Sequence, residues 1–340
     1  MESTEPQMDQ ENSNDSTTPG PEESIHPSFS ILRCFLLVIT TLLILTLNPF
    51  YLLILRHVNS IQETTKVFLR AMTIADIGVG ISVAIPATIS AFLGDWPFGD
   101  VVCTLQAAAN VFVYCIALFF LLIITVDRYI SVVYALRYPS LVTVKRARIA
   151  VCCAGGLSTL IPIVNGFITT WETLYLPPAL VCEFKLSNQN TSNIYTKVFF
   201  TILITFSLLV VFMTYIRLFL ISRHHARQIE ALNIALGGNQ PPQPPPRTNN
   251  KSLQTTLFIV LTSFFLNVVP IVCYITLDTD TNSHVEIFYL FFLLLPLLTQ
   301  SWVNGICYYL SNTDFRQTAN RLLKTHYQLC KNHIPFNGNT

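Results

Sequence analysis

Residues 101–129 read VVCTLQAAANVFVYCIALFFLLIITVDRY, and residues 101–126 contain no Asp, Glu, Lys or Arg. A helix of about 20 apolar residues crosses the hydrocarbon core of a bilayer. Lipid offers no partner for a backbone N–H or C=O group, so such a segment has to be helical. The stretch therefore predicts a transmembrane helix that ends at the triplet Asp127-Arg128-Tyr129.

Six further stretches share this length and apolar character, and Asp76 is the one acidic or basic residue within them. They cover residues 34–55, 71–94, 149–171, 198–216, 252–277 and 287–313. Of all 340 residues, 51% are apolar and 11% are charged, against about 25% charged in soluble domains. We therefore expect an all-α membrane protein, built as a bundle of seven transmembrane helices.

Assigning the connecting segments alternately to the two membrane sides separates the charges. The side opposite the N-terminus holds 17 Lys and Arg with 4 Asp and Glu, whereas the N-terminal side holds 3 Lys and Arg with 14 Asp and Glu. Basic segments stay in the cytoplasm. We therefore expect a plasma-membrane protein with its N-terminus outside and its C-terminus inside, the first helix serving as its own signal anchor.

The segments around the bundle divide the chain into three parts. Residues 1–28 hold seven acidic residues and no Lys or Arg, which predicts a disordered extracellular N-terminus. Residues 29–311 form the seven-helix domain, in which 222–250 is a long, proline-rich inner loop. Residues 312–340 form an amphipathic helix and a cytoplasmic tail.

Three short motifs lie outside the expected helices. Asn14 and Asn190 each begin a glycosylation sequon on the outer side, although such sequons also arise by chance. The third inner loop contains PPQPPPR at residues 241–247. This run fits a ligand for an SH3 domain, but a simple polyproline spacer is the favoured interpretation.

An amphipathic pattern follows the last expected span. Phe315, Ala319, Leu322 and Leu323 recur at helical spacing between basic residues, which predicts a short helix on the inner surface of the membrane, in contact with lipid. Cys330 comes after this pattern and is a candidate palmitoylation site. An unmodified cysteine in a frayed tail is the alternative.

The ordered set of motifs resembles the rhodopsin-like (class A) G-protein-coupled receptors over residues 30 to 330. The residues that fall at the motif positions are Asn48, Asp76, Trp96-Pro97-Phe98-Gly99, Cys103, Asp127-Arg128-Tyr129, Tyr215, Phe264, Pro270, Asn304 and Tyr308. The resemblance implies a receptor that binds an extracellular ligand and activates a heterotrimeric G protein, with arrestin as a further partner. It also pairs Cys103 with Cys182 in a disulfide on the oxidising outer side.

The resemblance assigns the coupling role to the Asp-Arg-Tyr triplet and to the later motif residues of the bundle. Arg128 would pair with Asp127 at rest and meet the G protein when the sixth helix swings outward. A structural arginine that snorkels to the interface is the alternative. Because no acidic residue stands near the inner end of the sixth expected helix, Arg128 has no carboxylate to pair with there. We therefore expect activity without ligand.

Asp76 is an ionisable residue near the middle of the second span, which is costly in lipid and marks a functional candidate. In the family this carboxylate, with Asn48 and Asn304 nearby, holds a sodium ion. A neutral Asp76 that is hydrogen-bonded to Asn48 and Asn304 is the alternative. Ala117 stands where other members often supply a hydroxyl group, so the sodium site is incomplete on that side.

Two departures from the family pattern concern the activation mechanism. Val268 stands in the sixth helix where a Trp is usual, and Gly305 follows Asn304 where a Pro is usual. Glycine still provides a flexible point, but the missing Trp removes the residue that usually transmits ligand contact. A scavenger or decoy receptor that does not signal therefore remains an alternative.

On the third helix Gln106, Asn110 and Tyr114 recur every fourth residue and so share one face. We expect them to line the ligand pocket with Tyr274 and Leu294, although polar residues also join membrane helices. Amine receptors of the family carry Asp where Asn110 stands, which argues against a monoamine. No Lys occurs in residues 287–313, which argues against retinal. A neutral or lipid-like small molecule fits an apolar pocket, and a basic peptide would suit the acidic outer face.

Other classes of protein fit the sequence poorly. A net charge of +1 leaves no basic surplus for a nucleic acid. The nine cysteines form no CxxC pair, so no metal site is expected, and we interpret most of them as packing residues in the membrane. No nucleophile with a base or phosphate-binding loop is visible, so we do not expect an enzyme or a cofactor. A transporter or channel would need paired intramembrane charges or repeated halves.

Overall fold

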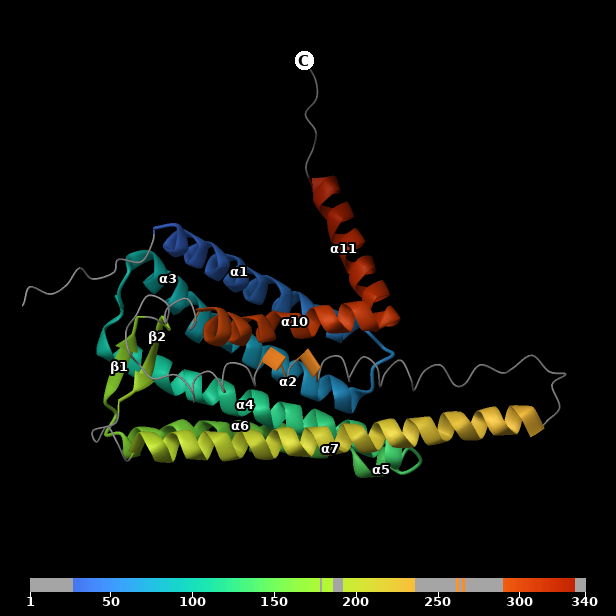
Figure 1. Ribbon diagram of the computed structural model, residues 1–340. Coiled ribbons are helices and arrows are strands. Elements are labelled where there is room, and N and C mark those ends of the chain that lie inside the picture. Colours follow the sequence, from blue (N-terminus) through green and yellow to red (C-terminus); the bar gives the residue numbers. More distant parts are fainter. Residues whose placement is uncertain are drawn as a thin grey trace, which may run out of the picture.

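The computed structural model describes residues 27–177, 179–185, 192–235, 261–262, 265–266 and 290–333. Within these ranges, six helices are long and apolar enough to cross a membrane. The expected span 252–277 lies outside the described residues apart from 261–262 and 265–266, which are helical. The all-α bundle is therefore confirmed, and six of its seven expected spans are observed (Figure 1).

Long helices form the body of the bundle. They are α1 (Pro27–His57), α2 (Glu63–Val79), α4 (Gly99–Val133), α6 (Val144–Ile168), α7 (Ser192–Ala235) and α10 (Leu295–Ser311). The remaining elements are η1 (Gly80–Ala84), α3 (Ile85–Leu93), α5 (Tyr138–Leu141), β1 (Thr173–Leu176), β2 (Val181–Phe184), η2 (Leu290–Leu294) and α11 (Thr313–His333). Helix α7 runs past the expected span 198–216 into the inner loop and ends at Ala235.

Two spans contain a wide, π-helical turn that sequence analysis did not predict. The second span passes from α2 through η1 into α3, and Pro86 follows η1 by two residues. The described part of the last span starts with η2, and Pro296 follows that turn by the same distance. Proline has no N–H and its ring collides with the carbonyl four residues earlier. A π-turn relieves that conflict without ending the helix.

Helix α11 begins directly after α10 and leaves it at a steep angle (Figure 1). Phe315 and Ala319 are buried in a cluster with Tyr51 of α1 and Tyr308 of α10. Further along α11 the apolar side chains emerge, since Leu323 is 52% exposed. The expected amphipathic helix is therefore observed, with its first turns docked on the bundle.

An antiparallel hairpin of β1 and β2 lies near the start of α4 (Figure 1). Tyr175 stands opposite Cys182 in its register. The hairpin base closes where Lys185 N–H donates to the carbonyl of Glu172 at 2.8 Å. This small sheet was not predicted, because its strands are only four residues long.

The cysteines do not all pack in the core. Cys115 and Cys307 are buried as expected, but Cys152 and Cys153 are exposed on α6. The buried face of α6 contains Ala154 and residues at helical spacing from it, such as Ser158. The neighbouring Cys152 and Cys153 therefore point away from the bundle. Their interpretation as packing residues was wrong.

Candidate functional site

The C-terminal end of α4, which is expected to face the cytoplasm, carries a buried ion pair. Arg128 donates from Nε to Asp127 Oδ2 at 3.1 Å, and its Nη2 donates to the same oxygen. The side chains are 14% and 3% exposed, respectively. Removing one partner of such a buried pair costs about 3–5 kcal/mol, because the other charge is left uncompensated. The expected pairing of Arg128 with Asp127 is therefore present in this structure.

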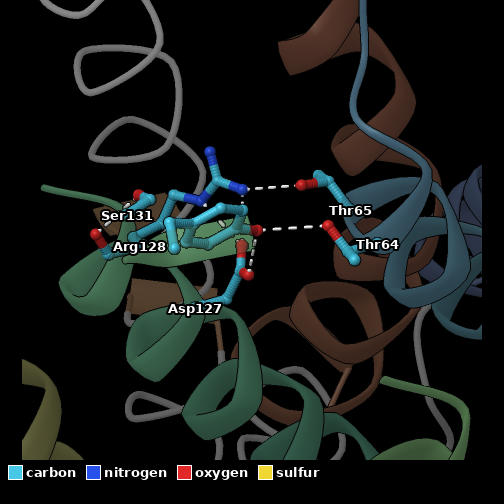
Figure 2. A network of polar contacts seen from close by, with 6 residues as sticks. Thr64, Thr65, Asp127, Arg128 and Ser131 are labelled. Carbon is cyan, nitrogen blue, oxygen red and sulfur yellow. Dashed lines mark hydrogen bonds and ion pairs between the residues drawn. The ribbon is translucent and has the colours of Figure 1, made fainter. Parts of the chain in front are cut away.

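Three neutral hydroxyl groups extend this pair across the bundle (Figure 2). Arg128 Nη2 donates to Thr65 Oγ1 at 2.7 Å. The Tyr138 hydroxyl donates to Asp127 Oδ1 at 2.7 Å and lies 3.1 Å from Thr64 Oγ1. Thr64 and Thr65 begin α2, and Tyr138 begins α5. The pair thus connects α4 to the start of α2 and to the inner loop. We call these five residues the inner lock.

Burial raises the pKa of the Tyr138 phenol, and the nearby Asp127 carboxylate adds to this effect. The phenol therefore stays protonated and acts as a donor to Asp127. Sequence analysis found Asp127 and Arg128 but missed Thr64, Thr65 and Tyr138. These three residues belong to no compact motif, and the one available signal was a tyrosine directly before Pro139 at the start of a loop.

The other expected coupling residues lie outside the inner lock. Tyr129 contacts the ring of Tyr134, with the centroids 6.4 Å apart, and Tyr215 packs beside Leu121. Tyr308 stacks at 5.9 Å from Tyr51. Phe264, Pro270, Tyr274, Asn14, Asn190 and the side chain of Cys330 lie outside the described residues.

A cavity of about 40 Å³ lies beside Asp76 in the middle of the bundle. Asp76, Gln300, Ser301 and Asn304 supply its polar lining, and α4 contributes only apolar side chains, Ala117 among them. Within the described part of the chain, Asp76 Oδ2 is buried and has no hydrogen-bond partner. The cavity is large enough for a water molecule or a small ion.

Asn48 does not bond to Asp76, contrary to one of the two alternatives. Its Nδ2 donates to the carbonyl of Ser301 at 2.9 Å and to that of Ile44 at 3.0 Å. The amide thus joins α1 to α10. Asp76 faces Ser301 and Asn304 instead. Carboxylate, hydroxyl and amide oxygens are suitable ligands for a hard cation, so these three residues fit a sodium ion.

At the N-terminal end of α4, which is expected to face outward, Cys103 and Cys182 form the expected disulfide, which ties α4 to β2. Gln106 Oε1 accepts the Cys182 N–H at 2.9 Å, and Asn110 Nδ2 donates to the Cys182 carbonyl at 3.2 Å. Two members of the expected polar stripe therefore hold the hairpin backbone. These bonds join a helix to a strand, whereas the alternative expected bonds between two helices. The role of the stripe as a pocket wall stays a prediction.

The remaining expected pocket residues in the described chain are apolar contacts. Tyr114 packs beside Leu118 and Ile204 of α7. Leu294 is buried in a larger aliphatic cluster that includes the hairpin turn. The described residues contain no group of three or more potential metal ligands.

Three features define the chain as a helical membrane receptor. They are a membrane-spanning bundle, a hairpin held by a disulfide at one end, and a buried Asp-Arg pair at the other end. The chain belongs to the rhodopsin family of seven-transmembrane receptors: residues 27–308 match the family described as 7 transmembrane receptor (rhodopsin family). It is therefore a multi-pass membrane protein and not an enzyme.

Similar curated proteins include α-1A adrenergic receptors. The receptor of Canis lupus familiaris is 34% identical over 128 residues, which are 38% of this chain and 42% of that protein. The receptor of Cavia porcellus is 27% identical over 302 residues, covering 79% of this chain and 62% of that protein. That of Homo sapiens is 29% identical over 178 residues, covering 52% and 36%. The chain thus spans less than two thirds of the length of these relatives.

Proposed function

We propose that this chain is a G-protein-coupled receptor of the plasma membrane. An extracellular ligand binds in the outer half of the bundle, and a heterotrimeric G protein binds at the inner end. The observation that carries this proposal is the inner lock, in which Asp127 and Thr65 hold the buried Arg128.

The geometry of the inner lock supports a switch with two arrangements. Arg128 is tied to the start of α2 through Thr65, and Asp127 is tied to α5 through Tyr138. When α4 shifts against α2 and α5, both contacts break. The guanidinium of Arg128 then becomes exposed at the inner surface. Each of these hydrogen bonds involves a charged group and is worth about 1.5–3 kcal/mol. The lock therefore sets a barrier that differential ligand binding can overcome.

The distribution of exposed charge supports an inner position for this end. Arg137, Lys145, Arg148, Arg223 and Arg227 are exposed near α5, the start of α6 and the extension of α7. Basic residues at the ends of transmembrane helices favour the cytoplasmic side. This orientation places the N-terminus outside and the C-terminus inside.

For the ligand we propose a neutral or lipid-like small molecule. Asn110 offers an amide where an ammonium ligand would need a carboxylate, and that amide already donates to the Cys182 carbonyl. The nearby cluster around Leu294 is aliphatic. These features disfavour a monoamine, although the relatives that match the chain are named adrenergic receptors.

We also propose that Asp76, Ser301 and Asn304 hold a sodium ion in the central cavity. When bound, the ion would neutralise the buried carboxylate. The oxygen atoms on α2 and α10 would then be drawn together, since the α4 side of the cavity offers only apolar groups.

The experiment compares the wild type with Arg128→Ala at matched surface expression, using dissociation sensors for several G proteins. We expect a ligand-free signal that the variant loses. Arg137→Ala, a change at an exposed arginine near the lock, is the matched control and should keep the signal. Equal signal in wild type and Arg128→Ala would contradict the proposal. Uptake of ligand without any G-protein or arrestin response would favour the scavenger alternative.

A further inference from the structure

In the turn that joins β1 to β2, Pro177 is exposed, but Ala179, Leu180 and the first residue of β2, Val181, are buried in the helical bundle. Ala179, Leu180 and Val181 are 1%, 2% and 7% exposed. Turns of extracellular hairpins usually face solvent, because loops run over protein surfaces. The segment from Ala179 to Val181 instead faces inward, so three consecutive apolar side chains lie inside the bundle.

The backbone of the turn is strained at Leu180, whose φ is +56°. A left-handed conformation costs a residue with a side chain about 1–2 kcal/mol, and such strain persists only where the surroundings impose it. The N–H groups of Ala179 and Leu180 both donate to the Leu176 carbonyl, at 3.1 and 2.9 Å. The left-handed backbone at Leu180 therefore directs its side chain into the bundle.

The surroundings of the turn are aliphatic. Ala179, Leu180 and Val181 belong to one contiguous buried cluster with members from α1, α2, η1, α3, α4, η2 and α10. The helix residues of this cluster are Leu37, Ile44, Val79, Val83, Ala84, Ala87, Ala91, Val113, Leu290, Leu294 and Leu298. The disulfide at Cys182 places the turn at the outer end of α4, so the cluster lies in the outer half of the bundle.

The central cavity begins where this cluster ends. Val79 and Val113 belong to the cluster and also line the cavity beside Asp76. The turn therefore lies between the outer side and the buried carboxylate. Leu180 therefore lies in the outer half of the bundle, where the proposed ligand binds.

We propose that residues 179–181 are a built-in occupant of the outer ligand site, and that an external ligand binds by displacing them. This inference rests on the proposed receptor function and specifies its ligand class. The displaced side chains are aliphatic, so the ligand presents aliphatic surface of similar size to the same cluster. An ionic group placed among these aliphatic side chains would lose its hydration without compensation from them, which costs several kcal/mol.

The hairpin is built so that the turn alone moves. Cys182 is fixed by the disulfide and by Gln106 and Asn110. On the other strand, Thr173 Oγ1 lies 3.1 Å from Thr104 Oγ1 of α4. These contacts keep both strands on α4 while the strained turn between them withdraws.

The test measures access to the site and needs no G protein. Leu294→Cys places a thiol in the cluster, and a membrane-impermeant methanethiosulfonate reagent is applied from outside to the full chain in nanodiscs. We expect slow labelling in this variant. Adding Leu180→Gly removes the occupying side chain and suits the positive φ, so labelling should accelerate at least about tenfold. Adding 1-decanol as an aliphatic probe should slow it again.

The matched control is Leu174→Gly in the same hairpin, where the side chain is 52% exposed and no acceleration is expected. The same hairpin variants without Leu294→Cys report the background from native thiols. Far-UV circular dichroism and an intact Cys103–Cys182 disulfide establish that the variants fold. Equal labelling rates with and without Leu180→Gly would overturn the proposal, and so would acceleration that 1-decanol leaves unchanged. Neither result depends on whether the receptor couples to a G protein.

Discussion

The phenol of Tyr138 donates a hydrogen bond to Asp127 Oδ1 at 2.7 Å, although the two residues belong to different helices, α5 and α4. The other carboxylate oxygen accepts from Arg128. Asp127 therefore shares its charge between the arginine of the triplet and the inner loop. A movement of Tyr138 in the inner loop therefore changes the hydrogen bonding of Asp127, and through it the position of Arg128.

Tyr138→Phe should raise ligand-free signalling. It removes the donor to Asp127 and the contact with Thr64 while keeping the buried ring. Losing a bond to a charged carboxylate, worth about 1.5–3 kcal/mol, and a neutral bond of about 1 kcal/mol shifts a two-state equilibrium about thirtyfold or more. A G-protein dissociation sensor measures the effect. Tyr134→Phe, at a residue that is 48% exposed, serves as the control, and an equal rise in both variants would refute the assignment.

Thr65→Val should release Arg128 from α2 and also raise ligand-free signalling, by a smaller factor because only one bond is lost. The size of the side chain is preserved, so packing stays nearly constant. Thr65→Ser keeps the hydroxyl group and should restore the basal level. Failure of serine to restore it would show that the methyl group, and not the bond, is responsible.

Gly166→Ala should destabilise the outer end of α6. A Cβ at this position would lie 2.6 Å from the ring of Trp171, which contacts Phe184 of the hairpin at 6.2 Å. Overpacking of this kind costs about 1–3 kcal/mol. Gly156→Ala meets no atom within 4 Å and should be neutral or slightly stabilising. Thermal unfolding in detergent compares the two, and similar melting temperatures would count against this packing.

Cys103→Ser should lower both stability and surface expression. The disulfide closes a loop across a sequence separation of 79 residues, and losing such a link costs about 2–5 kcal/mol. Cys152→Ser changes an exposed cysteine and should behave like the wild type. A reducing agent should lower the melting temperature of the wild type but leave Cys103→Ser unchanged. A Cys103→Ser protein as stable as the wild type would contradict the prediction.

Asp76→Asn should abolish any stabilisation by sodium. The comparison uses sodium chloride against choline chloride at equal ionic strength, with the melting temperature as the readout. Sodium should stabilise the wild type, because ligand binding to the folded state raises stability. Ser301→Ala should weaken the effect, since it removes one oxygen of the cavity lining. Equal melting temperatures in the two salts for the wild type would refute the sodium site.

The spans were predictable from sequence because the hydrophobic signal of a transmembrane helix is local and long. The same holds for the buried Asp76, which stands out in an apolar stretch. The π-turns at Pro86 and Pro296 escaped prediction. A proline in a helix is compatible with a kink or a wide turn, and tertiary packing selects between them.

The inner lock and the buried turn depend on contacts between distant segments, which periodicity does not reveal. Thr64, Thr65 and Tyr138 are ordinary polar residues near helix ends, and only the fold brings them to Asp127 and Arg128. The polar stripe at Gln106 and Asn110 was placed on the correct face of α4. Its partner was missed, because a strand backbone that inserts into the bundle leaves no helical pattern.

The most direct test of the receptor account combines Tyr138→Phe with Arg128→Ala at matched surface expression. Tyr138→Phe alone should raise ligand-free G-protein dissociation, and adding Arg128→Ala should return it to the level of Arg128→Ala alone. That result would show that the lock acts by restraining Arg128. A raised signal that persists without Arg128 would contradict the account, because the freed arginine would then not be the group that couples.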